Sequence, residues 1–296
     1  MDNIGLVLEG GGLRGVYTAG VLEYFMENNL YFPYVIGVSA GAGMAASYLS
    51  RQKGRNWKVN IELAVDPRYI SLRNWLRNKE IFGMDFIFDE IPKHLVPFDF
   101  DTFLKAEENF IIGTTDCETG EPVYYSKQEH GEHMLTVMRA SSSLPFLAPS
   151  VAYDNRNLLD GGIVDPIPIR KAQTDGNKRN IVILTKPPHY RKKKSRLSGI
   201  LKYLSKQHPK IGEVLQTRHE LYNGTLNYLQ TEKEKGSVFI IQPSEDIRVG
   251  RMERNQEKLI QLYNLGIKDA ERFYPELQQF ILQNQKLNNH IIMTTH

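Results

Sequence analysis

The stretch Val35-Ile36-Gly37-Val38-Ser39-Ala40-Gly41 decides the fold, because it is an apolar, strand-like run that passes directly into a small-residue helix ending at Leu49. In a Gly-x-Ser-x-Gly pattern the serine sits on a sharp turn between strand and helix, where side chains in place of Gly37 and Gly41 would collide with neighbouring backbone. The helix N-terminus favours negative charge near the serine hydroxyl. We predict a nucleophile elbow with Ser39 as the nucleophile; the alternative is a turn that merely links strand to helix.

Length and composition indicate a globular α/β protein. The 296 residues, of which 41% are hydrophobic, suffice for one large core or two small ones. We expect a single domain over residues 1–296, with a motif-bearing core at about 4–184 and a C-terminal strand and helices at 185–296. A net charge of +3 does not indicate a nucleic-acid partner. The single cysteine, Cys117, excludes an intrachain disulfide and a cysteine cluster for zinc. Because the sequence also shows no signal-peptide pattern, we predict a cytoplasmic protein.

A second glycine-rich turn precedes the elbow. Residues 4–8 are typical of a buried parallel strand, and Glu9-Gly10-Gly11-Gly12-Leu13-Arg14-Gly15 then opens a helix. These glycines match the dinucleotide-binding pattern Gly-x-Gly-x-x-Gly, but such a site also requires an acid at the end of the second strand. The second strand ends in Val38-Ser39, and no Asp or Glu occurs between Glu27 and Glu62. A nucleotide site is therefore the less favoured alternative.

We favour an oxyanion hole at this glycine loop. The N–H groups of Gly10, Gly11 and Gly12 can line up on a developing negative oxygen, and Arg14 adds positive charge nearby. Loops that follow adjacent parallel strands emerge at the same edge of a sheet, so we expect this loop to face Ser39 across one crevice. The alternative for Arg14 is an ion pair with a surface carboxylate such as Glu9.

The candidate base is Asp160, which follows the short apolar run Leu158-Leu159 and precedes two glycines, Gly161 and Gly162. Adjacent glycines leave a carboxylate uncrowded, so that another loop can approach it. Asp-Gly is also one of the commonest turn pairs, and an ordinary turn is the alternative.

The other segments are expected to support this crevice. Between residues 51 and 101 we expect helices and loops that cap it, and we interpret their aromatic residues as ordinary core in preference to an acyl-chain pocket. We predict a hairpin of strands 109–114 and 122–126, a helix at 132–140, a polar loop at 141–146, and strands at 180–185 and 237–241. Helices are predicted at 213–230 and 253–273, with Pro275 starting a last one to about 287.

Together, residues 10–15, Gly37-Val38-Ser39-Ala40-Gly41 and Asp160-Gly161-Gly162 resemble the bacterial branch of the patatin-like phospholipases, in the order that the family has them. The resemblance covers roughly residues 4–184. It implies a three-layer α/β/α fold with a mainly parallel central sheet. It also implies a lipid acyl hydrolase, a phospholipase or carboxylesterase, that uses a Ser-Asp dyad and neither a metal nor another cofactor.

The match also implies residue roles. Ser39 would attack, Asp160 would serve as base, and Gly10, Gly11, Gly12 and Arg14 would form the oxyanion loop. The run Ser141-Ser142-Ser143-Leu144-Pro145 resembles a further family segment near the site. Asp165 stands where family members often carry an asparagine; we assign the base to Asp160 because it alone has the double glycine.

A dyad without histidine requires a physical account, because a free aspartate has a pKa of about 4 and is a poor base for a hydroxyl. Burial of Asp160 would raise its proton affinity, while the oxyanion loop and the helix dipole stabilise the charge that proton transfer creates. A Ser-Asp-His triad is one alternative, with His189, His208 or His219 available. The alternative from another class is a catalytically silent lipid- or nucleotide-binding module on the same fold.

A basic segment, Arg191-Lys192-Lys193-Lys194-Ser195-Arg196, precedes a helical stretch with Leu197, Ile200, Leu201 and Leu204. This layout suits peripheral contact with an anionic membrane, at its inner face for a cytoplasmic protein. A solvated loop before a core helix is the alternative. The segment lacks the interleaved aromatic residues of nucleic-acid-binding patches. We therefore predict a lipid or acyl ester as substrate and no nucleic-acid partner.

Overall fold

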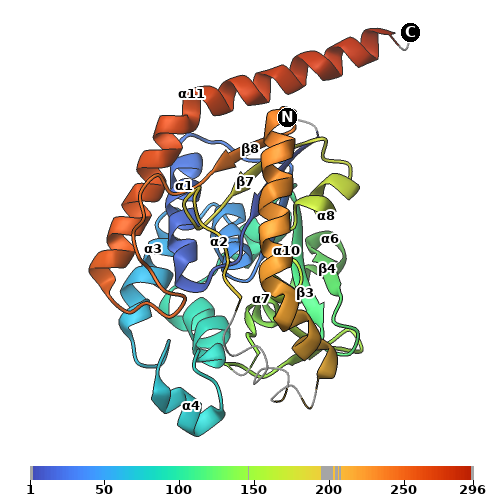
Figure 1. Cartoon of the computed structure of the whole chain (residues 1–296). Helices are drawn as coiled ribbons and strands as arrows, with labels where there is room; N and C mark the ends of the chain where they lie inside the picture. Colours follow the sequence, from blue (N-terminus) through green and yellow to red (C-terminus); the bar gives the residue numbers. More distant parts are fainter. Residues whose placement is uncertain (1–2, 146, 195–202, 204–205, 207, 295–296) are drawn as a thin grey trace.

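The computed structural model describes residues 3–145, 147–194, 203, 206 and 208–294, and at the centre of this part lies one sheet of eight strands (Figure 1). Its strands run in the order β5-β6-β3-β2-β1-β7-β8, and β4 pairs with β3 outside this path. β1, β2, β3, β7 and β8 are parallel, whereas β4, β5 and β6 pair antiparallel. Their bounds are β1 (Ile4–Leu8), β2 (Tyr34–Val38), β3 (Asn109–Asp116), β4 (Pro122–Ser126), β5 (Val151–Tyr153), β6 (Arg156–Asp160), β7 (Arg179–Ile183) and β8 (Val238–Ile241).

Helices flank this sheet. The α-helices are α1 (Val16–Glu27), α2 (Ala40–Leu49), α3 (Arg55–Trp57), α4 (Leu72–Asn78), α5 (Phe100–Lys105), α6 (Lys127–His130), α7 (Met134–Ser142), α8 (Ile169–Thr174), α10 (Pro209–Glu234) and α11 (Gln256–Thr294). Short 3₁₀ turns are η1 (Gly12–Gly15), η3 (Leu63–Val65), η5 (Gly131–His133) and η6 (Gly161–Ile163), and π-helical segments are η2 (Lys58–Glu62) and η4 (Phe86–Leu95).

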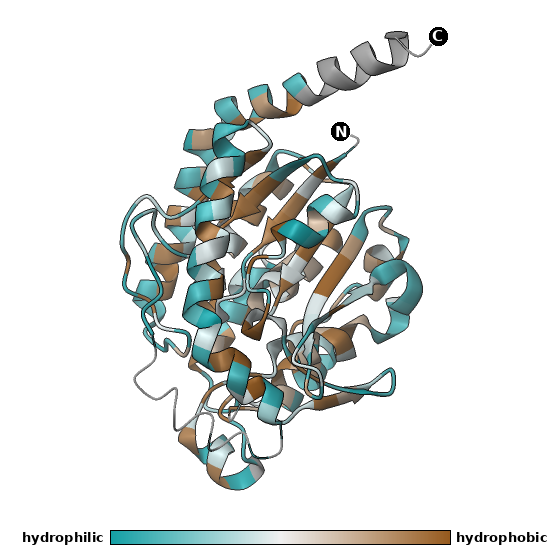
Figure 2. Ribbon diagram, turned by 45° about the vertical axis from the view of Figure 1, so that its right-hand side comes forward, coloured by the Kyte–Doolittle hydropathy of each residue, from teal (hydrophilic) through white to brown (hydrophobic). Residues whose placement is uncertain are grey.

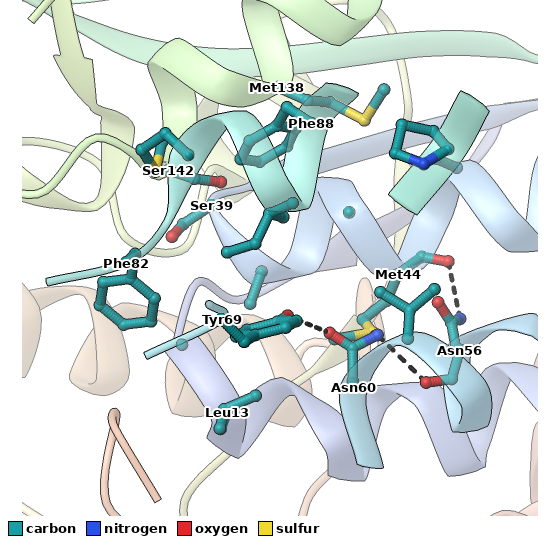
Figure 3. Close-up of a pocket in the computed structure, with 18 of the residues that line it drawn as sticks. Leu13, Ser39, Met44, Asn56, Asn60, Tyr69, Phe82, Phe88, Met138 and Ser142 are labelled. Atoms are coloured by element: carbon teal, nitrogen blue, oxygen red, sulfur yellow. Dashed lines mark hydrogen bonds between the residues drawn. The ribbon is translucent and has the colours of Figure 1, made fainter. Parts of the chain in front are cut away.

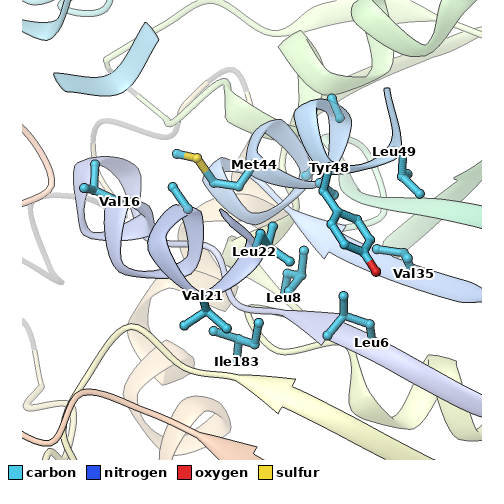
Figure 4. Packing of buried hydrophobic residues seen from close by; sticks show 14 of the residues in the cluster. Leu6, Leu8, Val16, Val21, Leu22, Val35, Met44, Tyr48, Leu49 and Ile183 are labelled. Atoms are coloured by element: carbon cyan, nitrogen blue, oxygen red, sulfur yellow. The ribbon is translucent and has the colours of Figure 1, made fainter. Parts of the chain in front are cut away.

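The alternation of side chains along the buried strands builds a separate core on each face of the sheet. Leu6 and Leu8 of β1 join a core formed with α1, α2 and α11, part of which is drawn in Figure 4. Val7, between them, joins a second core with residues of α8 and α10. In Figure 2 the apolar colour is concentrated on the strands between these helices. The predicted three-layer α/β/α fold with a mainly parallel sheet is confirmed.

The structure corrects two predicted elements. The segment 141–146 is not all loop, because α7 continues through Ser142. α11 passes through Pro275 without a break, although an interior proline typically costs a helix about 3 kcal/mol. Leu277, Phe280 and Ile281 are buried beyond that proline, and their burial offsets the cost. The hairpin of β3 and β4 is confirmed. The stretch predicted to be helical after residue 196 lies outside the described residues, apart from Tyr203.

α11 lies along α1, the helix that follows the glycine loop (Figure 1). The hydroxyl of Tyr17 on α1 donates to Oδ2 of Asp269 on α11 at 3.1 Å, a buried bond between residues 252 positions apart in the chain. The first and last helices are therefore packed as one layer over the sheet.

Candidate active site

Ser39 occupies the turn between β2 and α2 with φ 53° and ψ −125°. Positive φ is unfavourable for a residue with a Cβ atom, and such strain is typical of a nucleophile elbow. A Cβ on Gly37 would lie 2.7 Å from the nitrogen of Ala42, and one on Gly41 would lie 2.6 Å from the carbonyl oxygen of Leu8. The collisions predicted for this pattern are therefore present, and the local sequence dictates the turn.

Ser39 Oγ donates a hydrogen bond to Oδ2 of Asp160 at 2.7 Å, which brings together two residues 121 positions apart. The other carboxylate oxygen, Oδ1, accepts from the backbone N–H of Gly162 at 2.7 Å. Both side chains are enclosed, with 7% of Ser39 and 3% of Asp160 exposed. The structure thus places the predicted nucleophile and the predicted base in direct contact.

Burial raises the pKa of Asp160, while its hydrogen bond from Ser39 and the charges of Arg218 and Arg251 act in the opposite direction. Asp165 lies elsewhere, because its Oδ2 accepts from the Tyr124 hydroxyl at 2.5 Å and burial raises its pKa to about 6. Of the two aspartates, Asp160 is the one bonded to Ser39.

Histidines take no part in this hydrogen-bond network within the described residues. None of them bonds to Ser39 or Asp160, and His219 has Glu220 as its neighbour, with Nε2 and Oε1 3.6 Å apart. The described part of the site therefore holds a serine hydrogen-bonded to a carboxylate, with no histidine bonded to either. No group of three or more His, Cys, Asp or Glu side chains in this part of the chain could hold a metal ion.

The glycine loop follows β1, which pairs in parallel with β2, and so it meets Ser39 at the same edge of the sheet. The N–H of Gly10 donates to the carbonyl of Pro166 at 3.2 Å, and that of Leu13 donates to the carbonyl of Arg251 at 3.1 Å. Among the described residues, the N–H groups of Gly11 and Gly12 have no acceptor. Two of the three predicted glycine donors are therefore available to a ligand.

Arg14 lies beside Glu9 and Arg251 and is half-buried. Burial and the neighbouring charge of Arg251 lower the pKa of its guanidinium. Its Nε is buried without an acceptor in the described part of the chain. Glu9 instead accepts from Thr185 at 2.6 and 2.9 Å and from Tyr222 at 2.7 Å. The alternative of a surface Arg14–Glu9 ion pair is wrong, because Glu9 is buried and its oxygens bind other donors.

Ser141 is a site residue whose role the sequence did not reveal. Its hydroxyl accepts from the backbone N–H of Ser39 and donates to the carbonyl of Gly113 on β3. The neighbouring Ser143 contributes its carbonyl, which accepts from the N–H of Asp160 at 2.8 Å. The sequence indicated that residues 141–143 lie near the site. Their hydrogen bonds to backbone atoms leave no sequence pattern, so the sequence could not predict which of these serines makes which contact.

An apolar cavity opens beside Ser39 (Figure 3). Its wall combines residues of α2 and α7, such as Met44 and Met138, with the segment predicted to cap the crevice. Phe82, Phe88 and Phe98 of that segment line the cavity as well as packing on the core, so the interpretation as ordinary core was incomplete.

The far end of this cavity is polar (Figure 3). The Tyr69 hydroxyl donates to Asn60, which in turn donates to the carbonyl of Asn56, each at 3.1 Å. These groups satisfy one another, so the lining combines an apolar wall with a hydrogen-bonded polar patch at Asn56, Asn60 and Tyr69.

A family model described as patatin-like phospholipase matches residues 6–172. The chain belongs to the patatin-like phospholipase family. This membership assigns it to a family of lipid ester hydrolases, as the fold and the position of Ser39 had suggested. A second model, a domain of unknown function (DUF6363), matches residues 208–282, which include α10, β8 and much of α11.

Relatives of this patatin-like chain include proteins from bacteria and fungi. The uncharacterized protein YjjU of Escherichia coli (strain K12) is 26% identical over 98% of this chain and 82% of its own length. The lysophospholipase NTE1 of Candida albicans is 23% identical over 93% of this chain, which spans only 20% of that protein. VipD of Legionella pneumophila aligns in structure over 92% of this chain and 66% of its own, with 12% identity and a TM-score of 0.49.

Proposed function

We propose that the protein is a lipid acyl hydrolase that cleaves carboxylic esters through an acyl-enzyme on Ser39, with Asp160 as its base. The observation that carries this proposal is the 2.7 Å hydrogen bond from Ser39 Oγ to Asp160 Oδ2 at a strained strand-to-helix turn. A buried serine whose hydroxyl points at a buried carboxylate is arranged to lose its proton during attack.

In the acylation step, Ser39 Oγ attacks the ester carbonyl carbon while its proton passes to Asp160. The carbonyl oxygen becomes negative and accepts from the free N–H groups of Gly11 and Gly12. The intermediate collapses by breaking the bond to the alcohol oxygen, which takes the proton from Asp160 and leaves. A water molecule then attacks the acyl-serine, with Asp160 again as base, and releases the carboxylic acid and free Ser39.

Burial supports Asp160 in a role that histidine plays in other serine hydrolases. A desolvated carboxylate holds a proton more readily than an exposed one, so proton transfer from the Ser39 hydroxyl costs less free energy. The Gly162 N–H keeps one oxygen fixed while the other faces Ser39. Catalysis by Ser39 and Asp160 would thus depend on the burial of the carboxylate as much as on the hydrogen bond between the two residues.

The apolar cavity supports a fatty acyl chain as the acid part of the substrate. It extends from Ser39 between methionine and phenylalanine side chains, which offer an acyl chain an environment free of water. The NTE1 relatives carry the name lysophospholipase, which favours a phospholipid or lysophospholipid as the acyl ester. The alcohol part would then lie on the opposite side of Ser39.

A fluorophosphonate tests this proposal directly. The intact protein should react stoichiometrically at Ser39, whereas Ser39→Ala should not be labelled and should hydrolyse no acyl ester. A folded protein that resists labelling would instead be a silent binding module. Replacing His189, His208 and His219 singly by Ala tests the triad alternative, because loss of activity comparable to Ser39→Ala in any one of them would require a histidine base.

The surface around the cavity offers a place for lipid contact, and we extend the proposal to peripheral binding at an anionic membrane. None of the described helices combines the length and apolarity of a membrane span. The described part of the basic segment, residues 191–194, is mostly exposed. α4 presents Leu72 and Leu76, 75% and 70% exposed. A cytoplasmic location, predicted from the sequence, would place this surface at the inner membrane face.

α4 also carries the charges that such a surface needs. Arg73, Arg77 and Lys79 are exposed around its apolar residues, a layout that suits anionic lipid. Ile70, which precedes α4, forms an isolated β-bridge with Phe82, and Phe82 lines the cavity. A lipid bound at α4 would therefore lie beside the cavity that leads to Ser39.

A further inference from the structure

A second cavity, of about 310 Å³, has four lysine and arginine side chains in its lining: the exposed Lys193 and the cluster Lys192, Arg218 and Arg251. Leu144 lines both cavities, so the two adjoin. Arg218 and Arg251 are close enough to Asp160 to act on its charge. The cations therefore face the proposed reaction centre and not a remote surface.

The backbone and side-chain contacts hold these cations in place. Arg218 donates from Nε to the carbonyl of Gly162 at 2.6 Å, the residue whose N–H binds Asp160. The carbonyl of Arg251 accepts from Leu13 in the glycine loop, where Gly12 has φ 57° and no room for a Cβ beside Arg251. The side-chain amide of Asn223 bonds both the N–H and the carbonyl of Lys192, at 2.8 and 3.0 Å. These contacts fix the Arg218 side chain and the backbone at Lys192 and Arg251. The Lys192 ammonium lies 5.6 Å from the centroid of the Tyr222 ring, and neither it nor the Arg251 guanidinium has a hydrogen-bond acceptor among the described residues.

The cluster has no counter-ion in the described part of the chain. No carboxylate there forms a salt bridge with Lys192, Arg218 or Arg251. The two carboxylates that act on the cluster, Glu9 and Asp160, are already hydrogen-bonded to other groups. Burial and the neighbouring arginines lower the pKa of Lys192 to about 7 and that of Arg218 to about 10. The charges are held together against their mutual repulsion, which a bound anion would relieve.

We propose that Lys192, Arg218 and Arg251 form a subsite for the phosphate group of the substrate's alcohol part, an assignment that rests on the proposed ester hydrolysis at Ser39. The guanidinium fork of an arginine matches two phosphate oxygens, and a lysine adds a point charge. An acyl chain in the apolar cavity places the ester at Ser39, and the alcohol then extends into the cationic cavity. A phospholipid or lysophospholipid meets both requirements, whereas a neutral glyceride has no charge to place there.

This assignment also gives a role to the C-terminal part of the chain. Arg218 lies on α10 and Arg251 precedes α11, both within residues 208–282, the part matched by the domain of unknown function. The patatin match ends at residue 172 and contains none of the three cations. The C-terminal segment thus completes the site by supplying the head-group subsite, and it braces the glycine loop through the Arg251 carbonyl.

The test compares two substrates with one acyl chain: lysophosphatidate, which carries the phosphate, and the corresponding neutral monoacylglycerol. The readout is the ratio of their kcat/KM values, so that effects on the shared chemistry cancel. Arg251→Ala and Lys192→Ala should each lower this ratio at least about tenfold, which corresponds to about 1.4 kcal/mol, because each removes a hydrogen bond to a charged group. Arg248→Ala, an exposed arginine three residues from Arg251, is the matched control and should leave the ratio unchanged.

Calorimetric titration with glycerol phosphate and with inorganic phosphate provides a readout independent of turnover. Glycerol phosphate should bind to the intact protein and to Arg248→Ala but not to Arg251→Ala. An unchanged ratio of kcat/KM values in Arg251→Ala and Lys192→Ala would overturn the proposal. If inorganic phosphate still bound in that case, the cavity would be a site for free anions and not for the substrate. Binding of glycerol phosphate that depends on Arg251, in a protein that hydrolyses neither ester, would uphold the subsite and refute the proposed hydrolysis instead.

Discussion

The backbone N–H of Ser39 donates to the Oγ of Ser141, 2.8 Å away, and that hydroxyl donates onward to the carbonyl of Gly113 at 2.6 Å. The serine side chain thus connects the elbow to β3, the strand that neighbours β2. Ser141 is fully buried, so neither bond can be replaced readily by solvent. It satisfies the backbone N–H of Ser39, a residue with a strained backbone, and so holds the direction of this proposed nucleophile.

Replacing Ser141 by alanine should therefore reduce turnover without touching a reacting group. The buried N–H of Ser39 would lose its acceptor, at a cost of roughly 1–3 kcal/mol in the free energy of unfolding. Misplacement of the hydroxyl should lower kcat by about 10-fold to 10²-fold. Steady-state kinetics and urea unfolding measure the two effects. Ser143→Ala is the matched control, since that hydroxyl bonds to the carbonyl of Arg139 and not to the elbow; equal loss of kcat in both variants would contradict the positioning role.

Asp160→Asn should abolish turnover while the protein stays folded. An amide cannot take the serine proton, and loss of a general base costs at least about 10²-fold in rate. Asp165→Asn, whose carboxylate accepts from Tyr124, should be much milder. If Asp165→Asn proved the more damaging of two folded variants by circular dichroism and kinetics, the base would have to be reassigned.

The pH dependence of kcat/KM should show an acid limb shifted to higher pH by the burial of the proposed base, Asp160. Only the ionised form of Asp160 can accept a proton, and burial raises its pKa above the ordinary 3.8. Activity should therefore fall with decreasing pH at values above those typical of an exposed aspartate. A neutral short-chain ester is the substrate for this measurement. Asp165 titrates at about 6 and could mimic the effect, so the acid limb must persist in Asp165→Asn; a limb that disappears in that variant would belong to Asp165.

Arg14→Ala should lower kcat more than it raises KM, because the guanidinium supplies positive potential to the glycine loop. Loss of a direct oxyanion donor costs about 10²–10³ in rate, and an indirect role should cost less, about tenfold. Arg14→Lys should fall between the two, since an ammonium keeps the charge but not the planar fork. Arg248→Ala serves as a control for loss of one positive charge. An unchanged kcat in folded Arg14→Ala would remove Arg14 from the proposed oxyanion site.

Lipid binding should depend on α4. The double variant Leu72→Asp and Leu76→Asp should bind vesicles containing phosphatidylglycerol at least about tenfold more weakly in a sedimentation assay, because two apolar contacts are lost and two negative charges are added. Leu282→Asp, an exposed leucine on α11, is the matched control. Binding that survives in the α4 variant but is lost when residues 191–194 are replaced by serine would move the contact to the basic segment.

The sequence predicted the parts of the molecule that local geometry determines. The turn at Ser39 needs glycines on both sides. Leu6, Val7 and Leu8 are all buried, which needs a sheet covered on both faces, and their continuous apolar run predicted this. Asp160 could be predicted as the partner of Ser39 because a double glycine follows a short apolar strand and because the motifs resemble those of the family. Each of these features depends on residues close together in the chain.

Features that depend on distant residues were missed. Pro275 was expected to start a new helix after a break, and only packing beyond it shows why α11 continues. Arg218 and Arg251 lie far from Ser39 in sequence and in no repeated pattern, so nothing local predicts that they line one cavity with Lys192. Gly10 illustrates the same limit, because its N–H is taken by Pro166, a contact that only the folded chain creates.

The layer formed by α1 and α11 joins two segments that the ribosome makes at different times. The glycine loop and α1 are synthesised well before Asp269, which lies 252 positions from its partner Tyr17, and before Arg251, the acceptor for Leu13. Contacts between such distant positions form late in folding. A nascent chain that already carries Ser39 and Asp160 therefore still lacks the two contacts that support the glycine loop and α1.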